Sequence, residues 1–471
     1  MVCKILLCFL AVGLIYYSRY SSVVVAAFGF SIFGYIVTDY LIPRVGPSFI
    51  KIGLFGKDLS KVGKPVLPEC IGAVSATVYL FIMFFYIPFI FYRYLVTVTS
   101  GGGQRDVTVD QWQQQQQHTQ YSVFPHSRLS EYLSSTLCLE STILLGIADD
   151  LFDIRWRHKF FLPAVAAIPL LVVYYIDFGV TSVLVPGFVK DLISKTALFL
   201  HNKGLPVDIS LRDITSIDLK GFYYIYMASM AIFCPNSINI LAGINGLEVG
   251  QSIVLGFLAL INDTLYMTLG SELTKNSHRF SIVLIIPFLG VSLALFKWNK
   301  WPAKVFVGDT YCYFAGMVFA VVGIQGHFAK TMLLLFIPQI INFMYSVPQL
   351  FNMVFCPRHR LPKFNETDGL LYPSRANLKE NPPKSFFVPI LKLLGICHLI
   401  DLEIDEKTGQ LLSCSNMTII NLMLVWFGPM REDKLCNLIL ACQFMIGVAA
   451  IILRHFIGSI IFQHDNLWTI K

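Results

Sequence analysis

The chain has 471 residues, of which 55% are hydrophobic and only 14% charged, and its formal net charge is +7. Soluble domains carry about 25% charged residues, and no compact soluble fold has enough interior to bury this many apolar side chains. Composition and a mean hydropathy of +0.64 therefore exclude a soluble protein and predict an all-α polytopic membrane protein. The modest positive charge fits cytosol-facing loops better than nucleic-acid binding.

Apolar runs of about 20 residues predict ten transmembrane helices. They lie at 22–42, 71–95, 133–148, 160–178, 222–243, 249–268, 280–297, 305–324, 330–350 and 435–456. An eleventh run, 5–17, is shorter and directly precedes the first good span. It fits a signal-type segment, a short interfacial helix or an additional span, and the sequence does not distinguish these.

The distribution of Lys and Arg orients the ten spans. Loops 43–70, 149–159, 244–248 and 298–304 carry ten Lys or Arg in about fifty residues, whereas the internal loops opposite carry nine in nearly twice that length. Positive charge marks the cytosolic side, so these four loops and 351–434 are predicted to be cytosolic. The expected organisation is an apolar segment (1–21), a nine-span core (22–350), a small cytosolic subdomain with amphipathic helices lying on the membrane (351–434), and a last span with a lumenal tail (435–471).

The first polar cluster closes the third predicted span. Asp149 and Asp150 lie side by side there, and Arg155, Arg157 and Lys159 follow within nine residues of Asp150. Paired carboxylates next to cations at a membrane surface suit a site for Mg²⁺ and phosphates. The alternative is a solvated acidic helix end followed by an ordinary positively charged loop.

The second cluster interrupts the cytosolic end of the fifth predicted span. Asn236 and Asn239 share a helix face, and Gly243, Asn245 and Gly246 follow them. Carboxamides and glycines at this depth allow polar contacts and close backbone approach by a ligand. Hydrogen bonding between helices is the alternative, and it explains one Asn more easily than three.

Two further clusters lie on the same predicted side. Asp309 enters the start of the eighth predicted span, where a buried carboxylate requires a metal ion or another cation, unless it caps the helix. Arg358, His359 and Arg360 lie between two prolines and form a compact anion clamp, unless they only touch anionic lipid. Carboxylates, carboxamides and cations on one membrane face together indicate phosphoryl-type transfer onto a lipid.

The stretches 146–163, 233–251, 305–317 and 356–362 resemble the polyprenyl-phosphate N-acetylhexosamine-1-phosphate transferase superfamily. Within it they resemble the fungal-type members of the branch specific for GlcNAc, because Arg358-His359-Arg360 stands where a bacterial relative has a His-rich motif. The resemblance implies ten spans, an endoplasmic reticulum membrane, a cytosolic active site and a homodimer. It also implies transfer of GlcNAc-1-phosphate from UDP-GlcNAc to dolichyl phosphate, and possible association with the complex that adds the second GlcNAc.

The resemblance assigns a role to individual positions. Asp309 and Asn239 would bind Mg²⁺ together with the pyrophosphate oxygens, and Lys159 would contact phosphate. Arg358 would contact the pyrophosphate, with His359 and Arg360 beside the sugar N-acetyl group and the phosphates.

The remaining assignments concern the nucleotide and the acceptor. The uridine site would consist of Leu59 (through its backbone), Glu69, Gly243, Asn245 and Phe306, with Phe306 stacking on uracil. Asn236 belongs to the expected substrate-binding set, and Asp149 and Asp150 would line the acceptor side.

Two mechanisms and two other functions stay open at this point. The acceptor phosphate is an anion that can attack the β-phosphorus directly, or the transfer passes through an aspartyl intermediate on Asp149 or Asp150. A nucleotide-sugar transporter would place polar groups near the middle of the membrane between repeated halves, and no repeat is visible here. A membrane scaffold for other glycosyltransferases is the third function considered.

Overall fold

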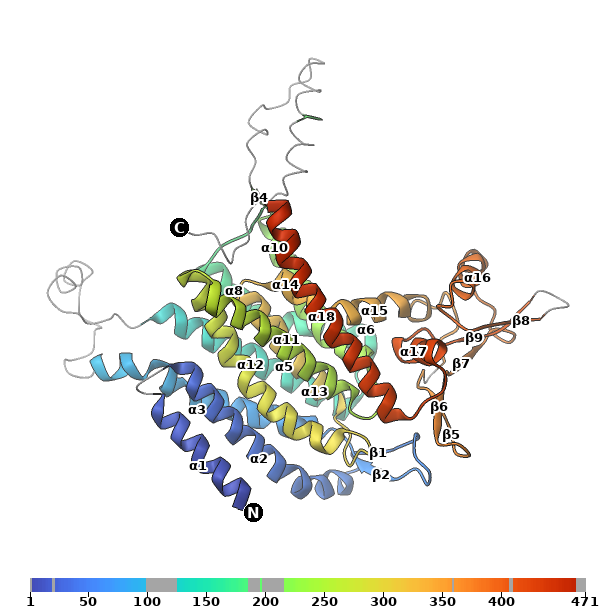
Figure 1. The fold of residues 1–471 in the computed structure, drawn as a ribbon, viewed down its shortest axis with the longest axis horizontal. Coiled ribbons are helices and arrows are strands. Elements are labelled where there is room, and N and C mark those ends of the chain that lie inside the picture. Colours follow the sequence, from blue (N-terminus) through green and yellow to red (C-terminus); the bar gives the residue numbers. More distant parts are fainter. Residues whose placement is uncertain are drawn as a thin grey trace.

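The structure is a computed structural model that describes residues 2–18, 22–98, 125–184, 195–196, 216–357, 360–405 and 410–462. Its long helices form one bundle (Figure 1). The bundle consists of α1 (Val2–Tyr17), α2 (Val23–Lys51), α3 (Gly72–Val98), α5 (His126–Phe152), α7 (Leu162–Ala166), α8 (Ile168–Asp177), α10 (Gly221–Ile240), α11 (Leu247–Leu269), α12 (Glu272–Asn299), α13 (Gly308–Gln325), α14 (Ala329–Leu335), α15 (Ile337–Leu350) and α18 (Glu432–Phe462).

Several of these helices are long and apolar enough to cross a membrane, which confirms the polytopic prediction. Six meet that description: α2, α3, the stretch Arg157–Asp177 that includes α7 and α8, α11, α12 and α18. The pair α14 and α15 forms a seventh if counted as one span, although it bends by 67° at Phe336. The predicted spans 133–148, 222–243 and 305–324 correspond to α5, α10 and α13, which are helical but outside this set.

Helix α13 lies in the interior of the bundle. Every side chain from Thr310 to Gln325 is buried, because α3, α5, α10 and α12 pack around it. The crossing with α10 is close: a Cβ built on Gly316 would lie only 2.3 Å from Cα of Pro235. A helix enclosed on all sides does not need a lipid-facing apolar surface, so moderate hydropathy is compatible with its central position.

Short pairs of antiparallel strands mark the two ends of the bundle. Strands β1 (Phe55–Lys57) and β2 (Val66–Pro68) pair antiparallel with Phe55 opposite Pro68. Strands β3 (Ser182–Leu184) and β4 (Ser216–Asp218) pair in the same way. Figure 1 shows β1 and β2 at one end of the long helices and β4 at the other. The described residues of the predicted site lie at the end that carries β1 and β2.

Residues 351–434 contain short strands as well as helices. Strand β5 (Lys363–Asn365) pairs with β6 (Leu370–Tyr372), and β7 (Arg375–Asn377), β9 (Leu411–Ser415) and β8 (Leu402–Ile404) form a three-stranded antiparallel sheet in that order. The helical elements are a 3₁₀ turn (Ser385–Phe387), α16 (Val388–Ile396) and α17 (Ile419–Phe427). The all-α prediction therefore holds for the bundle only, because strands this short leave no alternating pattern in a sequence.

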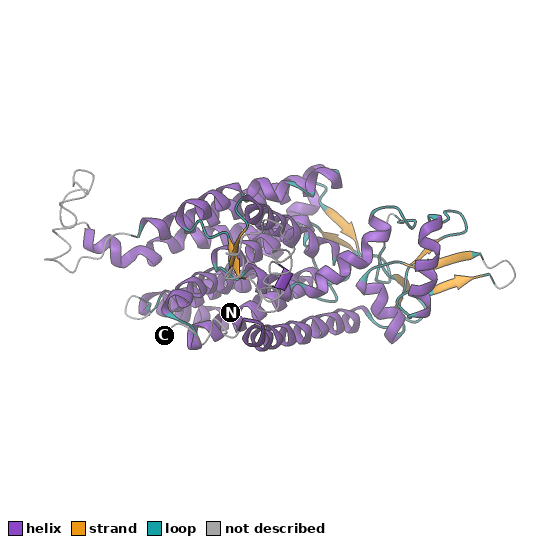
Figure 2. Cartoon of the chain, turned by 90° about the horizontal axis from the view of Figure 1, so that it is seen from above, coloured by secondary structure: helices purple, strands orange, loops and turns teal. Residues whose placement is uncertain are grey.

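This segment projects from one end of the bundle, where Figure 2 shows its strands in orange. It has its own hydrophobic cluster, which includes Phe387, Leu391 and Cys414. A second cluster joins it to the bundle, because Leu241 and Leu247 pack with residues such as Leu371, Ile420 and Leu435. The last turns of α15 add hydrogen bonds: Ser346 Oγ donates to the Met417 carbonyl (2.8 Å), and the Ile419 amide donates to Asn342 Oδ1 (2.9 Å). The segment is therefore firmly seated on the membrane helices.

Candidate active site

Three of the predicted residues form one ionic cluster. Lys159 Nζ lies 2.8 Å from Asp149 Oδ2 and 2.8 Å from Asp309 Oδ2. Asp149 is in the last turn of α5, which ends at Asp153 in a left-handed conformation (φ 48°), so that the chain turns back toward Lys159. The Ile154 amide donates to Asp149 Oδ1 (3.0 Å) and fixes this turn. The structure thus brings together side chains that are up to 160 positions apart in the chain.

Asp150 has a different role from its neighbour. Its carboxylate caps the N-terminus of α13, because Oδ1 accepts from the Asp309 amide (2.7 Å) and Oδ2 accepts from the Thr310 amide (3.1 Å) and the Thr310 hydroxyl. An anion at this position also interacts favourably with the helix dipole. The helix-cap alternative considered for Asp309 is therefore wrong, since Asp150 is the capping residue and Asp309 is free to contact Lys159.

Gly308 makes this cap possible. Its φ is +75°, in the left-handed region that favours glycine. A Cβ built there would lie 2.8 Å from Asp150 Oδ2 and 2.7 Å from Cα of Cys70. Any other residue would therefore push the capping carboxylate away from the helix end.

The cluster carries more negative than positive charge. Burial, followed by the charges of Asp150 and Asp309, raises the pKa of Glu69. Burial and the proximity of Asp309 raise the pKa of Asp149 to about 6, although Lys159 opposes the shift. Carboxylates that resist ionisation because of one another are stabilised by an added cation. The electrostatics therefore fit a site that binds a divalent metal.

The donor atoms also fit Mg²⁺, which prefers oxygen ligands. The side chain of Asp309 is 31% exposed, and the half-buried Asn239 carboxamide is not engaged in a hydrogen bond with any described residue. Within the described parts of the chain, no three His, Cys, Asp or Glu side chains are grouped so that they could hold a metal. A metal bound here would therefore take most of its ligands from substrate and water.

Glu69 and Phe306 lie together beside the β1–β2 hairpin. The Phe306 amide donates to the Pro68 carbonyl (2.8 Å), and the Ile71 amide donates to the Phe306 carbonyl (3.1 Å). A Cβ on Gly56 would lie 3.0 Å from two ring carbons of Phe306 and 3.4 Å from Glu69 Oε2. An aromatic face next to a carboxylate is suited to a nucleobase, which is the role that the family resemblance implies for these two residues.

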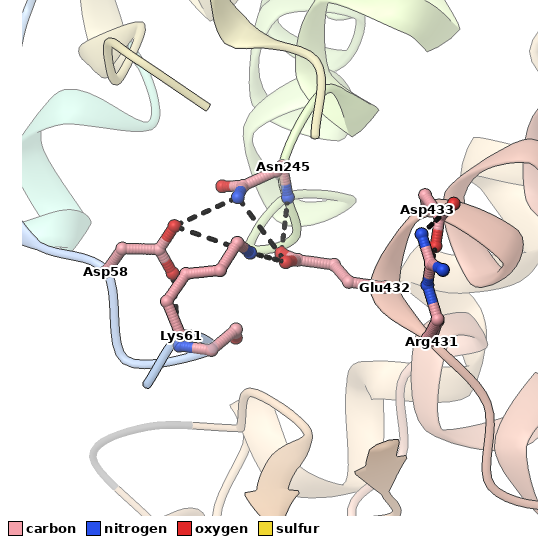
Figure 3. A network of polar contacts seen from close by, with 7 residues as sticks. Asp58, Lys61, Asn245, Arg431, Glu432 and Asp433 are labelled. Carbon is pink, nitrogen blue, oxygen red and sulfur yellow. Dashed lines mark hydrogen bonds and ion pairs between the residues drawn. The ribbon is translucent and has the colours of Figure 1, made fainter. Parts of the chain in front are cut away.

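Asn245 lies in a polar network that sequence analysis did not predict (Figure 3). Its Nδ2 donates to Asp58 Oδ2 (3.0 Å), and its backbone amide donates to Glu432 Oε1 (2.8 Å). Lys61 forms an ion pair with Glu432, and Lys61 Nζ lies 3.5 Å from Asp58 Oδ2. Leu59 directly follows Asp58 and is 53% exposed. No spacing in the sequence links loops 43–70, 244–248 and the start of α18, so only the fold reveals this network.

Asn236 and Gly243, in the fifth predicted span, form hydrogen bonds that hold the local chain in place. Asn236 Nδ2 donates to the carbonyls of Ile232 (2.8 Å) and Phe160 (3.2 Å), so that Asn236 holds the chain next to Lys159. This geometry corresponds to the structural alternative considered for it. Gly243 has φ +116°, its amide donates to Glu248 Oε1 (3.0 Å), and a Cβ there would overlap Leu361 Cδ2.

Arg360 reaches the same region from residues 351–434. Its carbonyl accepts from Asn421 Nδ2 (2.9 Å) and Ser374 Oγ (3.0 Å). Its Nη1 is buried and has no hydrogen-bond partner among the described residues, and burial lowers the pKa of Arg360. A buried guanidinium nitrogen without a partner fits an anionic ligand. Arg358 and His359 lie outside the described residues.

Several known proteins are similar to this chain in sequence. The family model described as Glycosyl transferase family 4 matches residues 132–327. A UDP-N-acetylglucosamine–dolichyl-phosphate N-acetylglucosaminephosphotransferase of Saccharomyces cerevisiae is 69% identical over 97% of each chain. The protein of the same name from Schizosaccharomyces pombe is 49% identical over 93% of each chain. A phospho-N-acetylmuramoyl-pentapeptide-transferase of Caldicellulosiruptor bescii is 33% identical over 28% of this chain and 38% of its own length.

Because Gly308 lies against the capping carboxylate of α13, we expect Gly308→Ala to lower the free energy of unfolding strongly. The substitution introduces an unfavourable left-handed φ, which costs about 1–2 kcal/mol, and an overpacked contact, which costs roughly 1–3 kcal/mol more. Gly53→Ala is the matched control, because Gly53 also has a positive φ (+92°) but nothing within 4 Å of its Cβ position. Thermal melts of both purified variants compare these costs. Equal losses of melting temperature would contradict the close approach of Asp150 to Gly308.

Proposed function

The chain belongs to the family of UDP-N-acetylglucosamine–dolichyl-phosphate N-acetylglucosaminephosphotransferases, and from this premise we propose that it transfers GlcNAc-1-phosphate from UDP-GlcNAc to dolichyl phosphate, with UMP as the second product. The observation that carries the proposal is the arrangement of Asp149, Lys159 and Asp309, with both lysine–carboxylate distances at 2.8 Å. It supplies a positioned cation and a half-exposed carboxylate at one end of the helices. The transporter alternative is not supported, because the clustered site residues lie at helix ends and not near mid-membrane.

The residues divide into a nucleotide side and a phosphate side. Phe306 stacks on uracil, with Glu69 beside it, and the turn around Gly243 and Asn245 receives the rest of the nucleoside. Lys159 and Arg360 contact phosphate oxygens. Mg²⁺, held by Asp309 and Asn239, would supply the positive charge that lowers repulsion between the two anionic substrates.

The reaction follows from this placement. A lipid phosphate oxygen attacks the β-phosphorus of UDP-GlcNAc, a new P–O bond forms, and the bond between the β-phosphorus and the bridging oxygen breaks. UMP leaves with that oxygen. Lys159 stabilises the charge that develops in the transition state, and its two carboxylate partners keep the ammonium in place. Because the acceptor is already an anion, no general base is required to activate it.

Topology and location complete the proposal. α5, α10 and α13 cross the membrane as well, which gives ten spans, and the site faces the cytosol from the endoplasmic reticulum membrane. Residues 351–434 then form a cytosolic subdomain whose exposed α16 side chains, Ile390, Leu393 and Ile396, rest on lipid. A homodimer and association with the complex that adds the second GlcNAc rest on the family resemblance alone.

The activity and the role of Asp309 are tested in one assay. UMP release from labelled UDP-GlcNAc should require dolichyl phosphate and Mg²⁺. Asp309→Asn and Asp309→Ala should both lower turnover by a factor of at least about 10³, because they remove the charged metal ligand. Asp153→Asn is the control for loss of charge, since Asp153 is exposed and Asn tolerates its left-handed φ. A near-normal rate in Asp309→Asn would remove Asp309 from the site, and absence of UMP release by wild-type protein would refute the proposed function.

A second prediction separates direct transfer from a covalent intermediate. With direct attack, Asp149→Asn slows turnover, and wild-type enzyme given labelled UDP-GlcNAc alone carries no label after denaturation. The engagement of both Asp150 oxygens by α13 supports direct attack, since this carboxylate is not free to act as a nucleophile. Isolation of a phospho-GlcNAc adduct on the protein would establish double displacement instead.

The orientation is tested at the sequon Asn365-Glu366-Thr367. If residues 351–434 are cytosolic, Asn365 stays unmodified in native protein, because glycosylation occurs in the lumen. The second sequon, at Asn416, is uninformative in either orientation: Asn416 is buried and bonded to Gln349 and Ser374. Gly101→Asn combined with Gly103→Ser creates a control sequon in a predicted lumenal loop, which should acquire glycan. Mass spectrometry that finds glycan on Asn365 would overturn the proposed orientation.

A further inference from the structure

Asp39 is a buried carboxylate within a membrane helix and lies outside the site described above. Its side chain is 1% exposed in α2, and it accepts from groups on two other helices. Lys297 Nζ and Trp298 Nε1 of α12 lie 2.8 and 2.9 Å from Oδ1, and Lys4 Nζ of α1 lies 2.7 Å from Oδ2. Burying an ionised group in a membrane segment is costly, so such residues require a functional explanation.

The contact with Lys4 makes α1 an integral part of the bundle. Ala11 is fully buried, and a Cβ on Gly29 would lie 2.7 Å from Ile15 Cγ1 and 2.8 Å from the Ala11 carbonyl oxygen. Lys4 faces Asp39 whereas Ile15 faces Gly29, so α1 and α2 run antiparallel, as Figure 1 also shows. α1 thus packs along α2, although its apolar part (Lys4–Tyr17) is shorter than the helices that are long enough to cross a membrane.

Hydrogen bonds together with adjacent residues of the chain link Asp39 with Phe306. The side chain of Trp298 donates to Asp39. The backbone carbonyl of Trp298 accepts a hydrogen bond from the Lys304 amide (2.8 Å). The neighbouring Asn299 Nδ2 donates to the Val305 carbonyl (3.0 Å). Val305 is followed by Phe306, whose amide donates to the Pro68 carbonyl. The turn between α12 and α13 is therefore held at its first residues by Asp39 and at its last residues by the β1–β2 hairpin.

We propose that Asp39 is a positioning residue for nucleotide binding, which acts through Trp298 and the 298–306 turn on Phe306, with Lys4 as a charge partner from α1. The inference rests on the proposed function, in which Phe306 stacks on uracil. Asp309 is held separately by Lys159 and by the cap from Asp150. Loss of the Asp39 contact should therefore weaken binding of UDP-GlcNAc without slowing the chemical step.

The test measures KM and kcat separately, together with the Kd of UDP-GlcNAc. Asp39→Leu and Trp298→Phe should each raise KM and Kd for UDP-GlcNAc by roughly tenfold, since misplacement of a binding group by about 1 Å has effects of this order or larger. The kcat and the KM for dolichyl phosphate should change by less than about twofold. Because both variants break the same link, the double variant should resemble the single ones.

The charge partner is tested by a conservative rescue. Lys4→Met should raise the KM for UDP-GlcNAc less than Asp39→Leu does, because Lys297 and Trp298 still contact Asp39. Lys4→Arg keeps the positive charge and should have the wild-type KM. Lys275→Met is the matched control on α12, since it breaks an ion pair with Glu272 at the opposite end of that helix. Its KM should equal that of wild type.

The alternative is that Asp39 only fastens three helices together. It predicts lower melting temperatures with unchanged KM and Kd, or effects that add in the double variant, and either result would overturn the inference. If Asp39→Leu does not fold, Asp39→Asn and Trp298→Phe decide the question by the same comparison. UMP release and nucleotide binding by wild-type protein are measured first, so failure of the proposed function is distinguished from failure of this inference.

Discussion

The position of the N-terminus of α13 is the constraint on which the site depends. Helix ends leave backbone amides without partners, and here the carboxylate of Asp150, from α5, accepts from two of them, those of Asp309 (2.7 Å) and Thr310 (3.1 Å). Gly308 provides the space and the left-handed turn that this contact needs. As a result Asp309 lies at a fixed distance from Lys159, and the two helices that carry the acidic residues cannot shift independently. The cap thus links the packing of the bundle to the geometry of the candidate metal ligand.

Charge imbalance explains why this arrangement suits phosphate transfer. Glu69, Asp149, Asp150 and Asp309 lie close together, and burial, followed by the neighbouring carboxylates, raises the pKa values of Glu69 and Asp149. Such a cluster is relieved by a divalent cation. The excess of carboxylates therefore fits the divalent metal that we propose for this site.

The proposed nucleotide side is assembled from segments that are distant in sequence. The β1–β2 hairpin, the α12–α13 turn, the loop after α10 and the first residue of α18 all contribute polar or aromatic groups. Residues 351–434 pack against the same region through Leu361 and the hydrophobic cluster around Leu241. Asp39 adds a connection from the opposite side of the turn. Each part is fixed by at least one contact to another part, which is how preorganised binding sites are built.

The sequence by itself determined the membrane class and the approximate positions of the helices, and it predicted Asp149, Lys159 and Asp309 as site residues, which the structure brings together around the Lys159 ammonium. It could do so because charged groups are rare and costly in apolar surroundings, so their positions are conspicuous. It did not determine that Asp150 caps a helix, that Asn236 holds the backbone beside Lys159, or that Asp58, Lys61 and Glu432 surround Asn245. Nor did it reveal the bend between α14 and α15, the short strands of 351–434, or the pairing of Lys4 with Asp39. These features depend on which residues from different helices come within hydrogen-bonding distance, and packing in three dimensions decides that, whereas local patterns of hydrophobicity do not.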